Sequence, residues 1–214
     1  MKLIKILIVV SYFYFTFLLL LITLQYIPLN FEVTFLKLKQ EEVRLSYYNI
    51  AFFTHVYTSI FLVLIGWIQF WPFFRKKYTN LHRLIGKFYI LIILMFSGPS
   101  ALIMGYHANG GTFSKISFII LSILWILFTY LSFYHAKNLN FEEHQKFAIR
   151  SFALTLSAIS LRLFKYIIVF LFHSPPMDTY RIVSWLGWVF NLIIAEIIIF
   201  YLFRNKIKNG IKIK

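Results

Sequence analysis

The sequence contains no cysteine, which excludes disulfides, thiolate metal sites, iron–sulfur clusters and covalently attached c-type haem. Acidic residues are also scarce, since the 214 residues include 7 Asp and Glu against 22 Lys and Arg, a formal net charge of +15. Charged residues make up only 14% of the chain, hydrophobic residues make up 60%, and the mean hydropathy is +0.76. These values exclude a water-soluble globule and a disordered chain. They indicate a single domain, residues 1–214, embedded in a lipid bilayer.

Long runs without a charged residue divide the chain. Four of them, and two further stretches with only a few charges, are long enough to cross about 30 Å of hydrocarbon as helices of roughly 20 residues. They do not alternate apolar and polar residues as the strands of a membrane β-barrel do. We therefore predict an all-α, polytopic bundle of six transmembrane helices. The spans are expected near residues 6–26, 50–74, 84–107, 116–136, 147–172 and 182–203.

The distribution of the cations predicts the orientation of this bundle. With six spans, both termini lie on the same side as the second-to-third and fourth-to-fifth loops, and that side collects fifteen Lys and Arg against five on the other. Basic loops face the cytoplasm, so both termini are expected to be cytoplasmic. The same rule, together with attraction to anionic lipid, accounts for the basic clusters. We therefore expect the lipid bilayer as a partner, and no nucleic acid.

Apart from Lys87 and Arg150, which lie near the cytoplasmic ends of their spans, three formal charges fall within the predicted spans: Arg162, Lys165 and Glu196. A charge at the middle of a bilayer costs at least ~2.5–3.5 kcal/mol and usually faces the bundle interior. At about 1.5 Å per residue, Arg162 lies roughly 22 Å and Glu196 roughly 11 Å from the inner edge, whereas Lys165 lies near enough to the outer interface to snorkel. We expect Arg162 and Glu196 to point inward. A direct ion pair between them remains open.

Small and polar side chains recur at helical spacing in the second, third and fifth spans. Stripes of this kind pack against other helices instead of lipid, so we expect a buried polar seam shared by the second, third, fifth and sixth spans. The candidate buried polar site comprises His55, Gln69, Arg162, Asn191 and Glu196. Interhelical hydrogen bonding without a ligand would also explain these residues.

The histidines suggest one specific chemistry. No His-Glu-x-x-His motif, Gly-rich phosphate loop or Gly-x-Ser-x-Gly elbow accompanies them, which leaves hydrolases poorly supported. Neutral imidazoles in a helical bundle do suit b-type haem with two axial histidines. His82 and His144 begin the third and fifth spans, at one depth, and are the candidate axial ligands. The nearby cations Arg83, Lys87 and Arg150 are candidate contacts for haem propionates, a quinone or lipid headgroups.

An ordered set of short motifs resembles a known family. The set runs from His55, Gly66 and Gln69-Phe70 through His82-Arg83-x-x-Gly86-x-x-Tyr89, Gly110-Gly111, Trp125, His144, Ile149-Arg150-Ser151 and Leu161-Arg162 to Trp185-x-x-Trp188-x-x-Asn191-Leu192-x-x-Ala195-Glu196. Over about residues 50–203 it resembles the uncharacterised bacterial membrane proteins grouped as domain of unknown function 2306, although Phe147-Ala148 replaces the Trp-Met common there. The resemblance implies a six-span protein of the bacterial cytoplasmic (inner) membrane, with no settled activity.

Three functions therefore stay open. The working hypothesis is a redox protein with a cytochrome b561-like plan, which binds haem b or a quinone and exchanges electrons with a quinone or a membrane redox partner. The first alternative is a carrier of a small solute or proton that uses Arg162 and Glu196, although no inverted repeat supports it. The second is an accessory or assembly subunit whose polar seam is structural.

Overall fold

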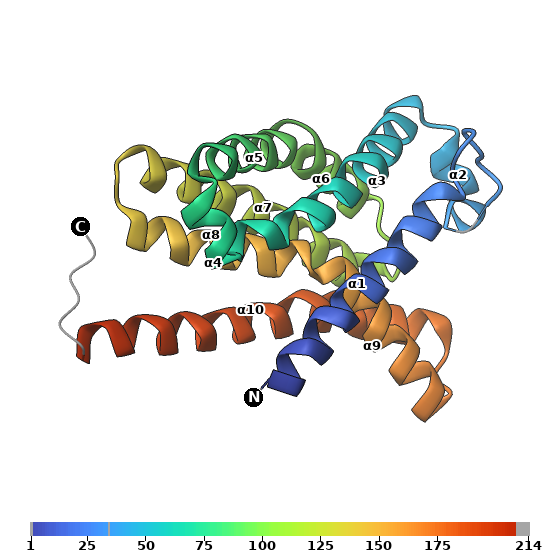
Figure 1. Ribbon diagram of the computed structural model, residues 1–214. Coiled ribbons are helices and arrows are strands. Elements are labelled where there is room, and N and C mark those ends of the chain that lie inside the picture. The colour runs from blue at the N-terminus through green and yellow to red at the C-terminus, as the bar shows by residue number, and fades with distance from the viewer. Residues whose placement is uncertain (1, 34, 209–214) are drawn as a thin grey trace.

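The computed structural model describes residues 2–33 and 35–208, and every regular element in those ranges is helical (Figure 1). Five segments are long and apolar enough to cross a membrane, and a sixth consists of two helices that meet at a bend of 42°. The five are α1 (Lys2–Leu24), α3 (Ser46–Gly66) with η2 (Trp67–Phe70), α5 (Thr79–Ile92) continued to α6 (Gly98–Tyr106), α7 (Gly111–Lys137) and α10 (Pro176–Lys208). The bent segment joins α8 (Phe141–Thr155) to α9 (Ser157–Phe172). The predicted all-α membrane bundle is confirmed.

The helices differ from the predicted spans mainly at their ends. Several begin earlier, because helical structure continues past the apolar run into polar residues: α8 begins at Phe141, where the Asn140 side chain accepts a hydrogen bond from the Glu143 N–H. The second span ends at Phe70 instead of residue 74, because Pro72 opens a separate short helix, α4 (Pro72–Lys77). Two short elements, η1 (Leu36–Leu38) and α2 (Gln40–Val43), lie in the first loop.

The helices pack unequally. α7 is central, with α6 and α8 along its sides, and α10 runs beside α7, α8 and α9 (Figure 1). α1 crosses the edge of the bundle and packs mainly against α3 and α9, and most of its apolar residues stay exposed. Such exposure suits a helix that faces lipid. The helices from α3 to α10 therefore contribute the main core of the protein.

The main hydrophobic core combines residues from five spans. Its buried members are Leu62, Tyr89, Ile93, Trp125, Leu154 and Trp188. Two of these are Trp residues and one is Tyr, so the core includes polar atoms that need partners. A second cluster, around Tyr26, Leu36, Tyr48 and Phe52, closes the end of the bundle where the first loop lies.

Two local distortions shape the bundle. The first is the bend between α8 and α9, where the Thr155 hydroxyl donates to the Ser151 carbonyl at 3.2 Å. A Ser or Thr hydroxyl that bonds back to the preceding turn competes with the backbone ladder and commonly bends a helix. The bend turns α9 away from the line of α8.

The second distortion is the π-helical turn η3 (Ile93–Ser97), which joins α5 to α6. Pro99 follows directly and has no N–H to donate to the preceding turn, so the regular hydrogen-bond ladder cannot continue through this point. The Ser100 hydroxyl lies 2.7 Å from the Phe96 carbonyl and 3.0 Å from that of Ser97. A Cβ at Gly98 would lie 2.6 Å from both the Ile93 carbonyl oxygen and Ile126 Cγ1. This position requires glycine.

We predict that Gly98→Ala destabilises the protein, because the added methyl group meets a backbone oxygen that cannot move independently. Overpacking of this kind costs about 1–3 kcal/mol. Gly86→Ala is the matched control, since the nearest atom to its new Cβ is the end of the Gln69 side chain at 3.3 Å. Thermal unfolding in detergent measures the difference, and equal melting temperatures for the two variants would contradict the prediction.

Candidate functional site

A hydrogen-bonded polar network occupies the middle of the bundle. Tyr89 Oη lies 2.7 Å from Thr155 Oγ1, and Trp125 Nε1 donates to the same hydroxyl at 3.1 Å. One turn away, the hydroxyls of Thr129 and Ser151 are 2.7 Å apart. These groups come from α5, α7 and α8 and are all buried. The network satisfies polar atoms that would otherwise be costly in a bilayer.

The network continues to α10 on one side. The Ser117 hydroxyl donates to the Ser184 carbonyl at 2.7 Å and accepts from Trp188 Nε1 at 2.9 Å. Asn191 donates to the Ala153 carbonyl at 3.0 Å and accepts from the Ser160 hydroxyl at 2.8 Å. Both amide atoms of Asn191 are thereby engaged with neighbouring helices.

On the other side the network reaches α3 at the π-helical turn. His55 Nδ1 lies 3.1 Å from the Ser97 carbonyl, and the hydroxyls of Thr58 and Ser97 are 2.6 Å apart. The His55 ring also meets the Trp125 ring edge-on, with centroids 6.4 Å apart. The His55 imidazole therefore hydrogen-bonds a backbone carbonyl of the distorted turn.

The seam differs from the expected one in its helices. The sequence reasoning placed it on the second, third, fifth and sixth spans, but the fourth span, α7, contributes as much as any other. Its polar residues recur at helical spacing, and that spacing is the signal that sequence reasoning missed. The buried Ser, Thr and Trp residues of α7 are Ser114, Ser117, Ser122, Trp125, Thr129 and Ser132.

Arg162 and Glu196 do not form an ion pair with each other. Glu196 accepts two hydrogen bonds from Arg150, at 2.6 Å from Nε and 2.9 Å from Nη2, and its side chain is 52% exposed. Arg162 donates instead to the Ala158 carbonyl of its own helix at 2.7 Å and is exposed. Arg162 is nevertheless close enough to His55 to interact with it electrostatically, and the inward direction of both side chains stays a prediction. The cation that meets the Glu196 carboxylate is Arg150, which lies on α8 before the bend.

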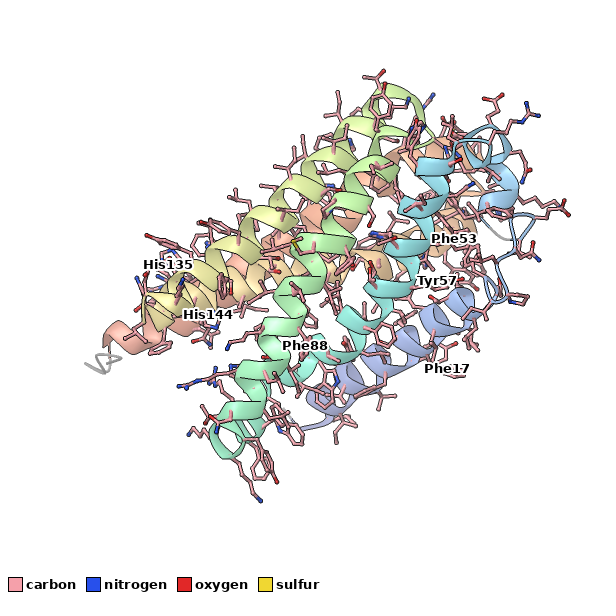
Figure 2. The ribbon with its side chains drawn as sticks, turned by 90° about the horizontal axis from the view of Figure 1, so that it is seen from above. Phe17, Phe53, Tyr57, Phe88, His135 and His144 are labelled. Atoms are coloured by element: carbon pink, nitrogen blue, oxygen red, sulfur yellow. The ribbon has the colours of Figure 1, made fainter. Side chains whose placement is uncertain are left out.

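The two candidate haem ligands occupy equivalent positions. His82 is the fourth residue of α5 and His144 the fourth of α8, and the two imidazoles are close enough to interact electrostatically. His144 Nδ1 lies 2.8 Å from the Ser132 carbonyl oxygen. His82 Nδ1 is buried without a hydrogen-bond partner. Figure 2 shows His144 and His135 at the same end of the bundle, and the His135 ring stacks on Phe147 with centroids 5.5 Å apart.

Another unpartnered atom belongs to a residue that lies against α5, at Gly86. Gln69 Nε2 is also buried without a partner, and Gln69 Oε1 lies 3.3 Å from where a Cβ of Gly86 would be. Gly86 follows His82 by four residues, so it shares a face of α5 with His82. Of the basic candidates, Arg83 and Lys87 are exposed, whereas Arg150 is engaged by Glu196 and lies 5.1 Å over the Phe147 ring.

The opposite end of the bundle is closed by an ionic cluster. The Lys39 side chain is 1% exposed, donates to Glu42 at 2.7 Å and also donates to the carbonyl of His107. Burial would raise the pKa of the Glu42 carboxyl, but the Lys39 hydrogen bond and charge outweigh burial and hold that pKa below its ordinary value. Burial lowers the pKa of the His107 imidazole, whose Nε2 lies 2.9 Å from Tyr47 Oη. This cluster ties the first loop to the α6–α7 turn.

The fold and this network define a polytopic helical membrane protein. The chain belongs to a family of predicted membrane proteins of unknown function, DUF2306, whose model matches residues 52–199. Over 73 residues, a third of the chain, it is 32% identical to the "Ava biosynthesis cluster protein G" of Aspergillus versicolor, and it covers 21% of that protein's length. No solved structure matches the chain. Within the described residues, no group of three or more His, Asp or Glu is arranged to hold a metal ion.

We predict that Arg150 and Glu196 are energetically coupled and that Arg162 and Glu196 are not. A double-mutant cycle of Arg150→Gln with Glu196→Gln should give a coupling free energy of about 1 kcal/mol, because a bidentate pair is partly screened where it is exposed. The matching cycle of Arg162→Gln with Glu196→Gln should give a value near zero. Thermal unfolding in one detergent measures both cycles, and the reverse order would restore the Arg162–Glu196 pair.

Proposed function

We propose that this protein is a membrane-embedded redox protein that binds one haem b between α5 and α8, with His82 and His144 as the axial ligands. The observation that carries this proposal is the buried Nδ1 of His82. It is the one imidazole nitrogen among six buried side-chain atoms that have no hydrogen-bond partner in the described residues. Buried polar atoms in native proteins almost always have partners, so an exception calls for a missing one. An iron ion would supply it.

The surroundings of His144 support the same assignment. Its Nδ1 lies 2.8 Å from the Ser132 carbonyl oxygen. A carbonyl oxygen has no proton to donate, so the imidazole is the donor in this hydrogen bond. The proton therefore sits on Nδ1, and Nε2 keeps its lone pair. A backbone carbonyl that fixes the tautomer of an imidazole in this way is the usual support of a metal-ligating histidine.

The arrangement of the helices is also compatible with a planar group. α6 packs closely along α7, whereas α5 makes few contacts with it, so these segments diverge toward the end that carries His82 and His144 (Figure 2). The exposed cations Arg83 and Lys87 on α5 are the proposed partners of the haem propionates. Arg150 is less suited to this role, since Glu196 already neutralises it. A bound haem would supply one-electron transfer to or from a quinone or a membrane redox partner.

We predict that the purified protein shows the sharp reduced-minus-oxidised spectrum of a six-coordinate b-type haem. His82→Ala and His144→Ala should each remove that spectrum, because six-coordinate haem needs both axial ligands. The measurement is an absorption spectrum in detergent before and after dithionite, with haem supplied during expression.

His135→Ala is the control for the haem assignment. His135 lies at the same end of the bundle, but its ring stacks on Phe147 at an interplanar angle of 1°. The spectrum should survive this substitution. Absence of haem from the wild-type protein, or retention of its spectrum in both ligand variants, would reject the redox proposal and favour an accessory subunit with a structural polar seam.

We also infer that the protein lies in a bacterial cytoplasmic membrane with both termini in the cytoplasm. The support is the fifteen-to-five distribution of Lys and Arg between the two ends of the bundle. The basic segment from Arg75 to Lys87 and the start of α8 then share the cytoplasmic side.

This orientation predicts the behaviour of reporter fusions. Alkaline phosphatase should be inactive and green fluorescent protein fluorescent when fused after Lys214. Alkaline phosphatase inserted at Asn109, in the α6–α7 turn, should be active. The opposite pattern would invert the bundle, and activity at both positions would mean that the number of spans is odd.

A further inference from the structure

Two cations stand unneutralised on the membrane-spanning part of α9. Arg162 and Lys165 are both exposed. The carbon atoms of their side chains, together with Tyr166 and Val169, line a shallow, almost wholly apolar hollow. The hydrogen bond that the structure gives to the Arg162 guanidinium runs to the Ala158 carbonyl of the same helix, at 2.7 Å. That bond uses Nη1, so the guanidinium has further N–H donors for another partner.

No acidic side chain compensates these charges. The sequence has 7 Asp and Glu, and in the described part of the chain none of them forms an ion pair with Arg162 or Lys165. Glu196 is taken by Arg150, and Asp178 lies 3.4 Å from Arg181. A positive charge at membrane depth without a counter-ion is costly, so an anion beside Arg162, within reach of the more superficial Lys165, would lower that cost.

We propose that this hollow binds an anionic phospholipid, with its phosphate between the Arg162 guanidinium and the Lys165 ammonium. Arg binds phosphate through two parallel N–H donors, and Lys adds a point charge. The apolar surface beside the cations comes from Tyr166, which is 70% exposed, and Val169, which is 40% exposed. That surface suits an acyl chain, which distinguishes a lipid from free phosphate.

The site lies beyond the bend between α8 and α9. Arg150 precedes that bend and engages Glu196, so this carboxylate is not available to Arg162 and Lys165. The site is separate from the proposed haem, since α9 carries neither His82 nor His144. The two proposals can therefore fail independently.

Lipid binding to delipidated protein in detergent tests this site. Native mass spectrometry would measure the affinity for dioleoyl phosphatidylglycerol and for dioleoyl phosphatidylcholine, with inorganic phosphate as a separate arm. Wild-type protein should prefer phosphatidylglycerol by about tenfold or more, the value expected for one charge-assisted hydrogen bond. Arg162→Gln and Lys165→Gln should each lose that preference, and Arg162→Lys should keep part of it.

Lys37→Gln is the matched control, because Lys37 is an exposed cation in the first loop, which is predicted to lie at the same end of the bundle. It should bind phosphatidylglycerol as the wild type does. The proposal would be overturned if the wild type bound both lipids with equal affinity, or if the two α9 glutamine variants kept the wild-type preference. It would also be overturned if inorganic phosphate alone bound as tightly as phosphatidylglycerol. If Arg162→Gln does not fold, Lys165→Gln and Arg162→Lys decide the outcome.

Discussion

The hydroxyl of Thr155 holds the centre of the bundle together. It donates to the Ser151 carbonyl and accepts from Trp125 Nε1, so its remaining lone pair accepts from Tyr89 Oη. All its hydrogen-bonding capacity is thereby used, and α5, α7 and α8 meet at one atom. In a bilayer there is no water to replace a lost partner, so this atom constrains the positions of all three helices.

The same hydroxyl lies next to the bend between α8 and α9. It bonds back to the Ser151 carbonyl, and a hydroxyl that does so commonly bends a helix. Arg150 precedes the bend and pairs with Glu196, whereas Arg162 follows it and donates to the Ala158 carbonyl of its own helix. The two charges that lie deepest in their predicted spans therefore have separate partners.

The sequence predicts the number and class of the helices because charge-free runs report directly on burial in hydrocarbon. It predicts Asn191 and His55 as members of the seam, since small and polar residues cluster around them at helical spacing. It does not predict that Arg150 pairs with Glu196, because Arg150 lies near the cytoplasmic end of its span, where a cation is expected to face lipid headgroups. The role of α7 was not predicted for a different reason. Its polar residues are Ser, Thr and Trp, which lower the hydropathy of an apolar run much less than a charged residue does.

Most donors and acceptors of the seam are paired between helices. Around Thr155 and Asn191 this pairing is interhelical hydrogen bonding of the kind that holds membrane helices together. Among the described residues, six buried side-chain atoms have no partner, and they belong to Asn49, Ser59, Gln69, His82, Ser114 and Ser157. Each such atom costs about 1–3 kcal/mol. His82 supplies the one imidazole nitrogen of this set, and the imidazole of His144, oriented by the Ser132 carbonyl, lies within electrostatic reach of it. This pair of imidazoles distinguishes His82 from the other unpaired groups and is the reason to test it for a ligand.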